Sequence, residues 1–154
     1  MPPRDLITNG NFNNGTTGWS GNDMEAHHNE SAYLGNGSTN RVAEMDGYGN
    51  QVTVMQQVVD VPYATTTALT FDSALRTASN SNAGREGFRV DILDSNGNVI
   101  ATQNVFPTAN SLQPYSMPVT FPNAGSYTVR MTELGPNDSH GAIVDNISLM
   151  VCFV

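Results

Sequence analysis

Lysine is absent from this chain, and all six basic residues are arginine. Only 13% of the residues are charged, while glycine, asparagine, serine and threonine dominate the polar part. Helical surfaces usually carry lysine, glutamate and glutamine, so this composition favours strands and turns. The formal net charge of −8 provides no basic surface for phosphates, which excludes nucleic acid as a partner.

Cysteine and long apolar runs are also scarce. The single cysteine, Cys152, excludes an internal disulfide framework. No apolar run approaches the ~20 residues of a membrane-spanning helix, and the start, MPPRDLI, does not have the layout of a signal peptide. Scarce lysine and cysteine with abundant asparagine are typical of bacterial extracellular proteins, so we expect an extracellular or cell-surface location. The length of 154 residues predicts one domain.

Apolar and polar residues alternate along most of the chain with the period of half-buried strands. In FRVDILD, for example, Phe88, Val90 and Ile92 fall on one side. The predicted strands include residues 52–59, 68–76, 88–94, 99–105, 115–121, 126–134 and 142–151. We find no convincing helix, although residues 108–112 are compatible with a single turn. The pattern predicts an all-β antiparallel sandwich of the jelly-roll type with about eight to ten strands.

Two short features locate a turn and a sheet edge. Asn96-Gly97 predicts a hairpin whose two central residues both need positive φ. Pro118 predicts an edge strand or a bulge in YSMPVTF, because proline has no N–H to donate to a neighbouring strand.

The two ends of the chain resemble one family. LITNGNFNNGTTGW (6–19) is similar to the opening of bacterial carbohydrate-binding modules, and GAIVDNISL (141–149) is similar to their last strand. VAEMD (42–46), QQVV (56–59) and LTFDSALR (69–76) follow in the expected order between them. The resemblance covers nearly the whole chain and implies a galactose-binding-like jelly roll of the kind found in glycanases and large secreted adhesins.

The same resemblance implies a structural calcium that bridges the first and last strands. The implied ligands are Asp145, the side chain of Asn13 and backbone carbonyls near Thr8 and Asn9. The family usually has an acidic residue where this chain has Asn13, and an amide oxygen is a poorer calcium ligand than a carboxylate. The alternative is that this segment forms ordinary turns and that Asp145 only accepts backbone hydrogen bonds.

The final residues, VCFV (151–154), resemble the entry to a Hint (intein-like) domain. This resemblance implies that residues 1–151 form a single carbohydrate-binding-like domain and that residues 152–154 begin a downstream autoprocessing domain. The alternative is a last strand that ends with a buried thiol at Cys152.

Polar residues that oppose the apolar strand positions are the candidates for ligand binding. Strand parity predicts one outward face of mixed carboxylates and arginines, formed by Glu44, Asp72, Arg76, Arg89, Asp91 and Arg130. Such a face can form directed hydrogen bonds to sugar hydroxyls, or it can be a solvated lattice of weak ion pairs. Glu25 and His27 share a face near the loop ends. Tyr33 and Tyr48 are candidate exposed ring platforms, and Tyr48 has the better loop context. The carbohydrate-binding residues that we predict are Glu25, His27, Glu44, Tyr48, Asp72, Arg76, Asp138 and His140.

No motif pairs two carboxylates as acid and nucleophile, and the sequence has neither Gly-x-Ser-x-Gly nor a phosphate loop. We therefore expect a non-catalytic module that binds a polysaccharide or cell-surface glycan within a larger, secreted bacterial protein, and no membrane insertion. The alternative is a structural or adhesive spacer domain without a ligand of its own, because one fold can serve both roles.

Overall fold

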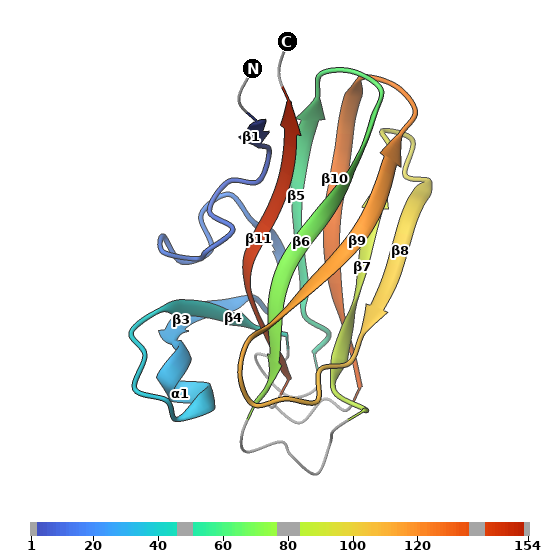
Figure 1. The fold of residues 1–154 in the computed structure, drawn as a ribbon. Helices are drawn as coiled ribbons and strands as arrows, with labels where there is room; N and C mark the ends of the chain where they lie inside the picture. The colour runs from blue at the N-terminus through green and yellow to red at the C-terminus, as the bar shows by residue number, and fades with distance from the viewer. Residues whose placement is uncertain (1–2, 46–50, 77–83, 136–140, 153–154) are drawn as a thin grey trace.

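A computed structural model describes residues 3–45, 51–76, 84–135 and 141–152, and Figure 1 shows their arrangement. These residues form two antiparallel sheets that pack face to face, with eleven strands and one short helix. The predicted all-β sandwich is therefore confirmed. The described part of the chain has slightly more strands than we predicted, because two of them contain only three residues.

The first sheet has the strand order β3-β4-β11-β6-β9, and β1 pairs with the other end of β11. Its strands are β1 (Pro3–Asp5), β3 (Glu25–Asn29), β4 (Arg41–Glu44), β6 (Thr65–Leu75), β9 (Gln113–Phe121) and β11 (Ala142–Cys152). Pro118 lies in β9, at the edge of the sheet, as its missing N–H predicts. Because β1 and β11 are antiparallel neighbours, the two ends of the chain emerge on the same side in Figure 1.

The second sheet has the strand order β2-β5-β10-β7-β8. Its strands are β2 (Ser20–Asn22), β5 (Val54–Val61), β7 (Gly87–Leu93), β8 (Val99–Val105) and β10 (Gly125–Leu134). The alternation read from the sequence holds, because Leu69 and Phe71 of β6 and Phe88 of β7 are buried between the sheets. The Phe71 ring stacks on that of Tyr115 and lies 5.7 Å from that of Phe88.

The polar segment that opens the chain is held by one asparagine. The Asn9 amide donates to the carbonyls of Gly15 and Thr17, at 3.0 and 2.9 Å, and the Asn9 carbonyl accepts the indole N–H of Trp19 at 3.0 Å. Phe12 and Trp19 are buried, with ring centroids 5.9 Å apart. This loop is therefore rigidly attached to the core although most of its residues are polar.

The predicted hairpin joins β7 and β8, but three local details differ from the predictions. The turn between β7 and β8 has positive φ at Gly97 alone, and the Asp94 N–H bonds to the Asn98 carbonyl. This is the longer hairpin loop in which a single left-handed glycine closes the turn. A short helix, α1 (Glu30–Leu34), forms where we predicted none and ends at Gly35 with φ 65°. Residues 108–112 form no helical turn.

Candidate functional site

The six polar residues that parity placed on one face belong to two different sheets. Glu44 lies on β4, Asp72 on β6 and Arg76 just after β6, so all three belong to the first sheet. Arg89 and Asp91 of β7 and Arg130 of β10 project from the second sheet. Parity along a strand is a local property, whereas the sheet that a strand joins depends on distant residues. The prediction of one continuous polar face is corrected to two separate faces.

On the first sheet, the structure brings three predicted residues together in what we call the Glu25–Glu44 cluster: Glu25, His28, Tyr33, Glu44 and Arg76. Glu25 is the cross-strand partner of Glu44, and their side chains are hydrogen-bonded. Arg76 donates to Glu44 at 2.7 Å and lies over the Tyr33 ring, 5.1 Å from its centroid. Glu44 is only 1% exposed, so its predicted place on an open face was wrong.

The reason for this burial is α1, which lies over the outer side of β4, β11 and β6. Tyr33 and Leu34 of α1 pack on Val42, Ala74 and Ile143 as a second small apolar cluster. Burial and the hydrogen bond with Glu25 raise the pKa of Glu44 to about 9, although Arg76 acts in the opposite direction.

Asp145, the predicted calcium anchor, is fully buried on β11. Its Oδ2 accepts a 2.6 Å hydrogen bond from the Asn40 amide, which also donates to Glu30. Its Oδ1 accepts no hydrogen bond from the residues that the structure describes. Burial raises the pKa of Asp145 to about 6, against the opposing effects of the Asn40 amide and the Asn146 backbone N–H. A buried carboxylate oxygen without a hydrogen-bond donor is a suitable ligand for a cation.

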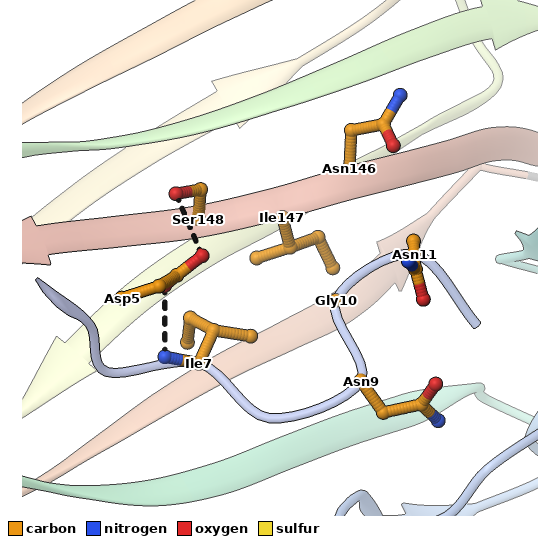
Figure 2. Close-up of a pocket in the computed structure, with 8 residues that line it drawn as sticks. All are labelled: Asp5, Ile7, Asn9, Gly10, Asn11, Asn146, Ile147 and Ser148. Atoms are coloured by element: carbon orange, nitrogen blue, oxygen red, sulfur yellow. Dashed lines mark hydrogen bonds between the residues drawn. The ribbon is translucent and has the colours of Figure 1, made fainter. Parts of the chain in front are cut away.

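The first loop lies against β11 at Ile147, two residues after Asp145 in the sequence. Figure 2 shows Gly10 beside Ile147, where the Ile147 N–H donates to the Gly10 carbonyl at 3.0 Å. The predicted carbonyl ligands are engaged: that of Thr8 accepts from Gln57, and that of Asn9 accepts from Trp19. Figure 2 shows Asp5 at a hollow beside this loop. Its carboxylate already accepts hydrogen bonds from Ile7, Ser148 and Leu149, so it is not open to a cation.

The structure does not place the remaining predicted residues at either of these two sites. Asn13 is exposed, and Asp72 accepts a 2.8 Å hydrogen bond from the Asn146 amide. Tyr48, Asp138, His140 and the side chain of His27 lie outside the described residues. Among the residues that the structure does describe, no group of three or more His, Cys, Asp or Glu is placed to hold a metal ion. The loop-end carbohydrate set and the calcium ligands stay predictions.

The second sheet carries a preorganised polar network on its outer face. Asp91 is 2% exposed and accepts hydrogen bonds from Arg89 at 2.9 Å, Arg130 at 3.3 Å and Thr102 at 2.7 Å. Burial alone raises the pKa of Asp91, but the hydrogen bonds from Thr102 and the two arginines outweigh it and hold the pKa below its ordinary value. Asp91 therefore stays charged and fixes the orientation of both guanidinium groups.

Beside this network lies an open hollow of about 360 Å³. Its lining includes Gln56 and Val58 of β5, Asp94 of the hairpin, and Ser126, Thr128 and Arg130 of β10. Val58 is 64% exposed, and the Arg130 Nε atom has no hydrogen-bond partner among the described residues. The hollow thus combines donors and acceptors with two apolar residues, Val58 and Leu93. The apolar–polar alternation of the sequence predicted that Arg130 points outward. The position of Gln56 opposite Arg130 depends on the register between β5 and β10, which the sequence alone does not give.

No helix among the described residues is both long and apolar enough to cross a membrane. No protein-family model matches the chain.

The chain is similar to solved carbohydrate-binding modules over nearly its whole length. It matches TmCBM61 in complex with β-1,4-galactotriose with a TM-score of 0.69 and 13% identity, covering 96% of this chain and 98% of that one. A family 16 module gives a TM-score of 0.63 and 22% identity, covering 96% and 99% of the two chains. A family 35 module from Clostridium thermocellum gives 0.61 and 15%, covering 96% and 97%. The resemblance to carbohydrate-binding modules is confirmed at the level of the fold.

In sequence, the chain is 32% identical over 145 residues to the multifunctional-autoprocessing repeats-in-toxin protein of Vibrio vulnificus. The match covers 92% of this chain but only 3% of the length of the toxin.

Proposed function

We propose that this domain binds carbohydrate without catalysis, on the outer face of β5, β10, β7 and β8. The observation that carries the proposal is the buried Asp91, which orients Arg89 and Arg130, and Arg130 lines an open hollow. The fold shared with carbohydrate-binding modules supports it, and TmCBM61 was solved with a bound galactotriose.

The chemistry of the hollow suits a sugar. Sugar hydroxyls need donors and acceptors in fixed positions, and Arg130, Gln56 and Thr128 supply both kinds. Val58 offers an apolar surface to the C–H groups of a ring. The described residues that line the hollow include no aromatic ring, so hydrogen bonds rather than ring stacking select the ligand.

Affinity electrophoresis against a polysaccharide panel that includes β-1,4-galactan tests this function. We expect retention of the natural chain, and binding weaker by roughly 10- to 100-fold in Arg130→Gln, because a hydrogen bond to a charged group contributes about 1.5–3 kcal/mol. Arg41→Gln, which removes the same charge from β4 on the other sheet, is the matched control and should bind as the natural chain does.

The outcomes separate the site from the function. Retention of no polysaccharide by the natural chain would show that the domain is not a carbohydrate-binding module. Equal losses in the Arg130 and Arg41 variants would place the site elsewhere, with the predicted loop-end residues as the next candidates.

The similarity to the toxin favours one further role. Because the matched region is 3% of a very long protein, we propose that this domain is one module of a larger extracellular or cell-surface bacterial protein. In that setting it could also act as a spacer without a ligand, and the same polysaccharide panel distinguishes the two roles.

We also propose a structural calcium at Asp145, with Asn13 and the carbonyls of Thr8 and Asn9 as the other ligands. The Asp145 Oδ1 atom supports this assignment, because it is buried without a donor. The Asn9 carbonyl must give up its hydrogen bonds to Phe12 and Trp19 to reach an ion, so we expect the first loop to move on binding. Bound calcium would neutralise the buried carboxylate and tie this loop to β11.

Differential scanning calorimetry with calcium or chelator measures the effect. A hundredfold excess over Kd stabilises the folded state by about 2.7 kcal/mol, which raises Tm by roughly 5–10 °C. Asp145→Ala should abolish the rise and Asn13→Asp should enlarge it, whereas Asp60→Asn on β5 should leave it unchanged. The rise should be smaller at pH 5 than at pH 8, because protons compete for a carboxyl of pKa about 6. An equal Tm with calcium and chelator would contradict the metal.

A further inference from the structure

We propose that β3 and α1 form a proton-dependent cap on the sandwich, held closed by a proton that Glu25 and Glu44 share and released when that proton is lost. By "the cap" we mean residues 25–34. It comprises β3, the edge strand paired with β4, and α1, which packs on the outer sides of β4, β11 and β6.

The geometry favours a shared proton. Glu25 and Glu44 are directly opposite each other on the antiparallel pair β3–β4, and their carboxyl groups lie within hydrogen-bonding reach of each other. Two carboxylates have only acceptors, so a hydrogen bond between them exists only while one is protonated. Glu44 is 1% exposed, so water cannot screen a second negative charge there.

The surrounding charges do not replace the proton. His28 of β3 lies 3.5 Å from Glu25 but is 45% exposed, and the Tyr33 hydroxyl of α1 is a neutral neighbour of both carboxyl groups. Among the described residues, Arg76, after β6, is the guanidinium at the pair, and it donates to Glu44. From β11, the residue opposite Glu44 is the apolar Ile143. One arginine thus faces two carboxyl groups, which leaves one charge to neutralise.

The apolar contacts of the cap are few. Ala26 is its one side chain in the main core cluster, and Tyr33 and Leu34 belong to the separate small cluster with Val42, Ala74 and Ile143. A segment with little apolar burial opens at a lower free energy than the core strands. Loss of the shared proton therefore acts on a segment with few apolar contacts, and opening uncovers Val42, Ala74 and Ile143.

The direction with pH follows from the raised pKa of Glu44. This pKa rises from 4.5 to about 9 in the folded protein, so the stabilisation is fully present below pH 4.5 and is lost as the pH rises through 9. Loss of one proton changes the opening constant of the cap by at most about tenfold per pH unit.

Hydrogen–deuterium exchange on the full chain, at pH 6 and pH 9 with intrinsic rates corrected, tests the proposal. We expect protection of the β3 and α1 amides to fall at least tenfold between the two pH values. The amides of β7 and β10 should stay better protected than those of the cap at both. Glu44→Gln should remove the pH dependence, because the amide donates to Glu25 without a shared proton. Glu25→Gln serves the same purpose if the first variant does not fold.

Asp60→Asn is the matched control, because it removes one carboxylate from an exposed position of β5 and should leave the response of the cap unchanged. Three results would overturn the proposal: equal protection of the cap at pH 6 and 9, a cap as protected as β7 and β10 at both, or an undiminished response in the Glu44 and Glu25 variants.

Discussion

Phe71→Ala should lower the free energy of unfolding by about 3–5 kcal/mol, one of the two largest effects that we expect in this domain. Phe71 is 1% exposed, and its ring contacts both Tyr115 of β9 and Phe88 of the opposite sheet. Truncation leaves a cavity that two flanking aromatic rings and rigid strands cannot fill. At ~2–4 °C per kcal/mol, Tm should fall by roughly 6–20 °C in calorimetry.

Phe106→Ala is the matched control, since Phe106 is 39% exposed at the end of β8 and its truncation should cost about 1 kcal/mol or less. Similar losses in the two variants would show that Phe71 does not hold the sheets together.

Gly10→Ala should cost about 2–4 kcal/mol, for a steric reason. A Cβ atom at Gly10 would lie 2.0 Å from the carbonyl oxygen of Ile147, so the first loop would have to move away from β11. That movement breaks the bond from the Ile147 N–H to the Gly10 carbonyl and leaves both groups in need of partners. Urea unfolding measures the loss, and the emission of Trp19, the single tryptophan, reports the loop.

Gly15→Ala tests the other possible cause of a stability loss on replacing glycine, which is a backbone conformation that favours glycine. Gly15 has φ 62° with no atom within 4 Å of an added Cβ, so its replacement should cost only about 1 kcal/mol. A smaller loss at Gly10 than at Gly15 would contradict the steric explanation.

The sequence predicts most of the sandwich because strand alternation is encoded locally. The period along FRVDILD fixes which side chains of β7 are buried whatever the strand pairs with. Membership of a sheet is not encoded in this way, which is why Asp72 and Asp91 seemed to share a face. The burial of Glu44 was not predictable for the same reason, since it depends on a five-residue helix too short to show a helical period.

The candidate site residues show the same difference between local patterns and long-range pairing. Asp145 was found from its family motif, and Arg89, Asp91 and Arg130 from parity. Asn40 was missed, because its hydrogen bond to Asp145 joins residues 105 positions apart and asparagine in a loop is unremarkable in the sequence. Thr102 was missed too, since only the β7–β8 register places it against Asp91.

The pairing of β1 with β11 has a mechanical consequence. Pro3 is opposite Cys152 and Asp5 is opposite Met150, so the two strands run antiparallel from one end of the sandwich. Hydrogen bonds of such a pair lie perpendicular to the strands. Tension applied at residues 3 and 152 therefore pulls along these bonds and opens them one at a time, as a zipper opens. Under stretching, β1 should detach at low force while the two sheets remain packed.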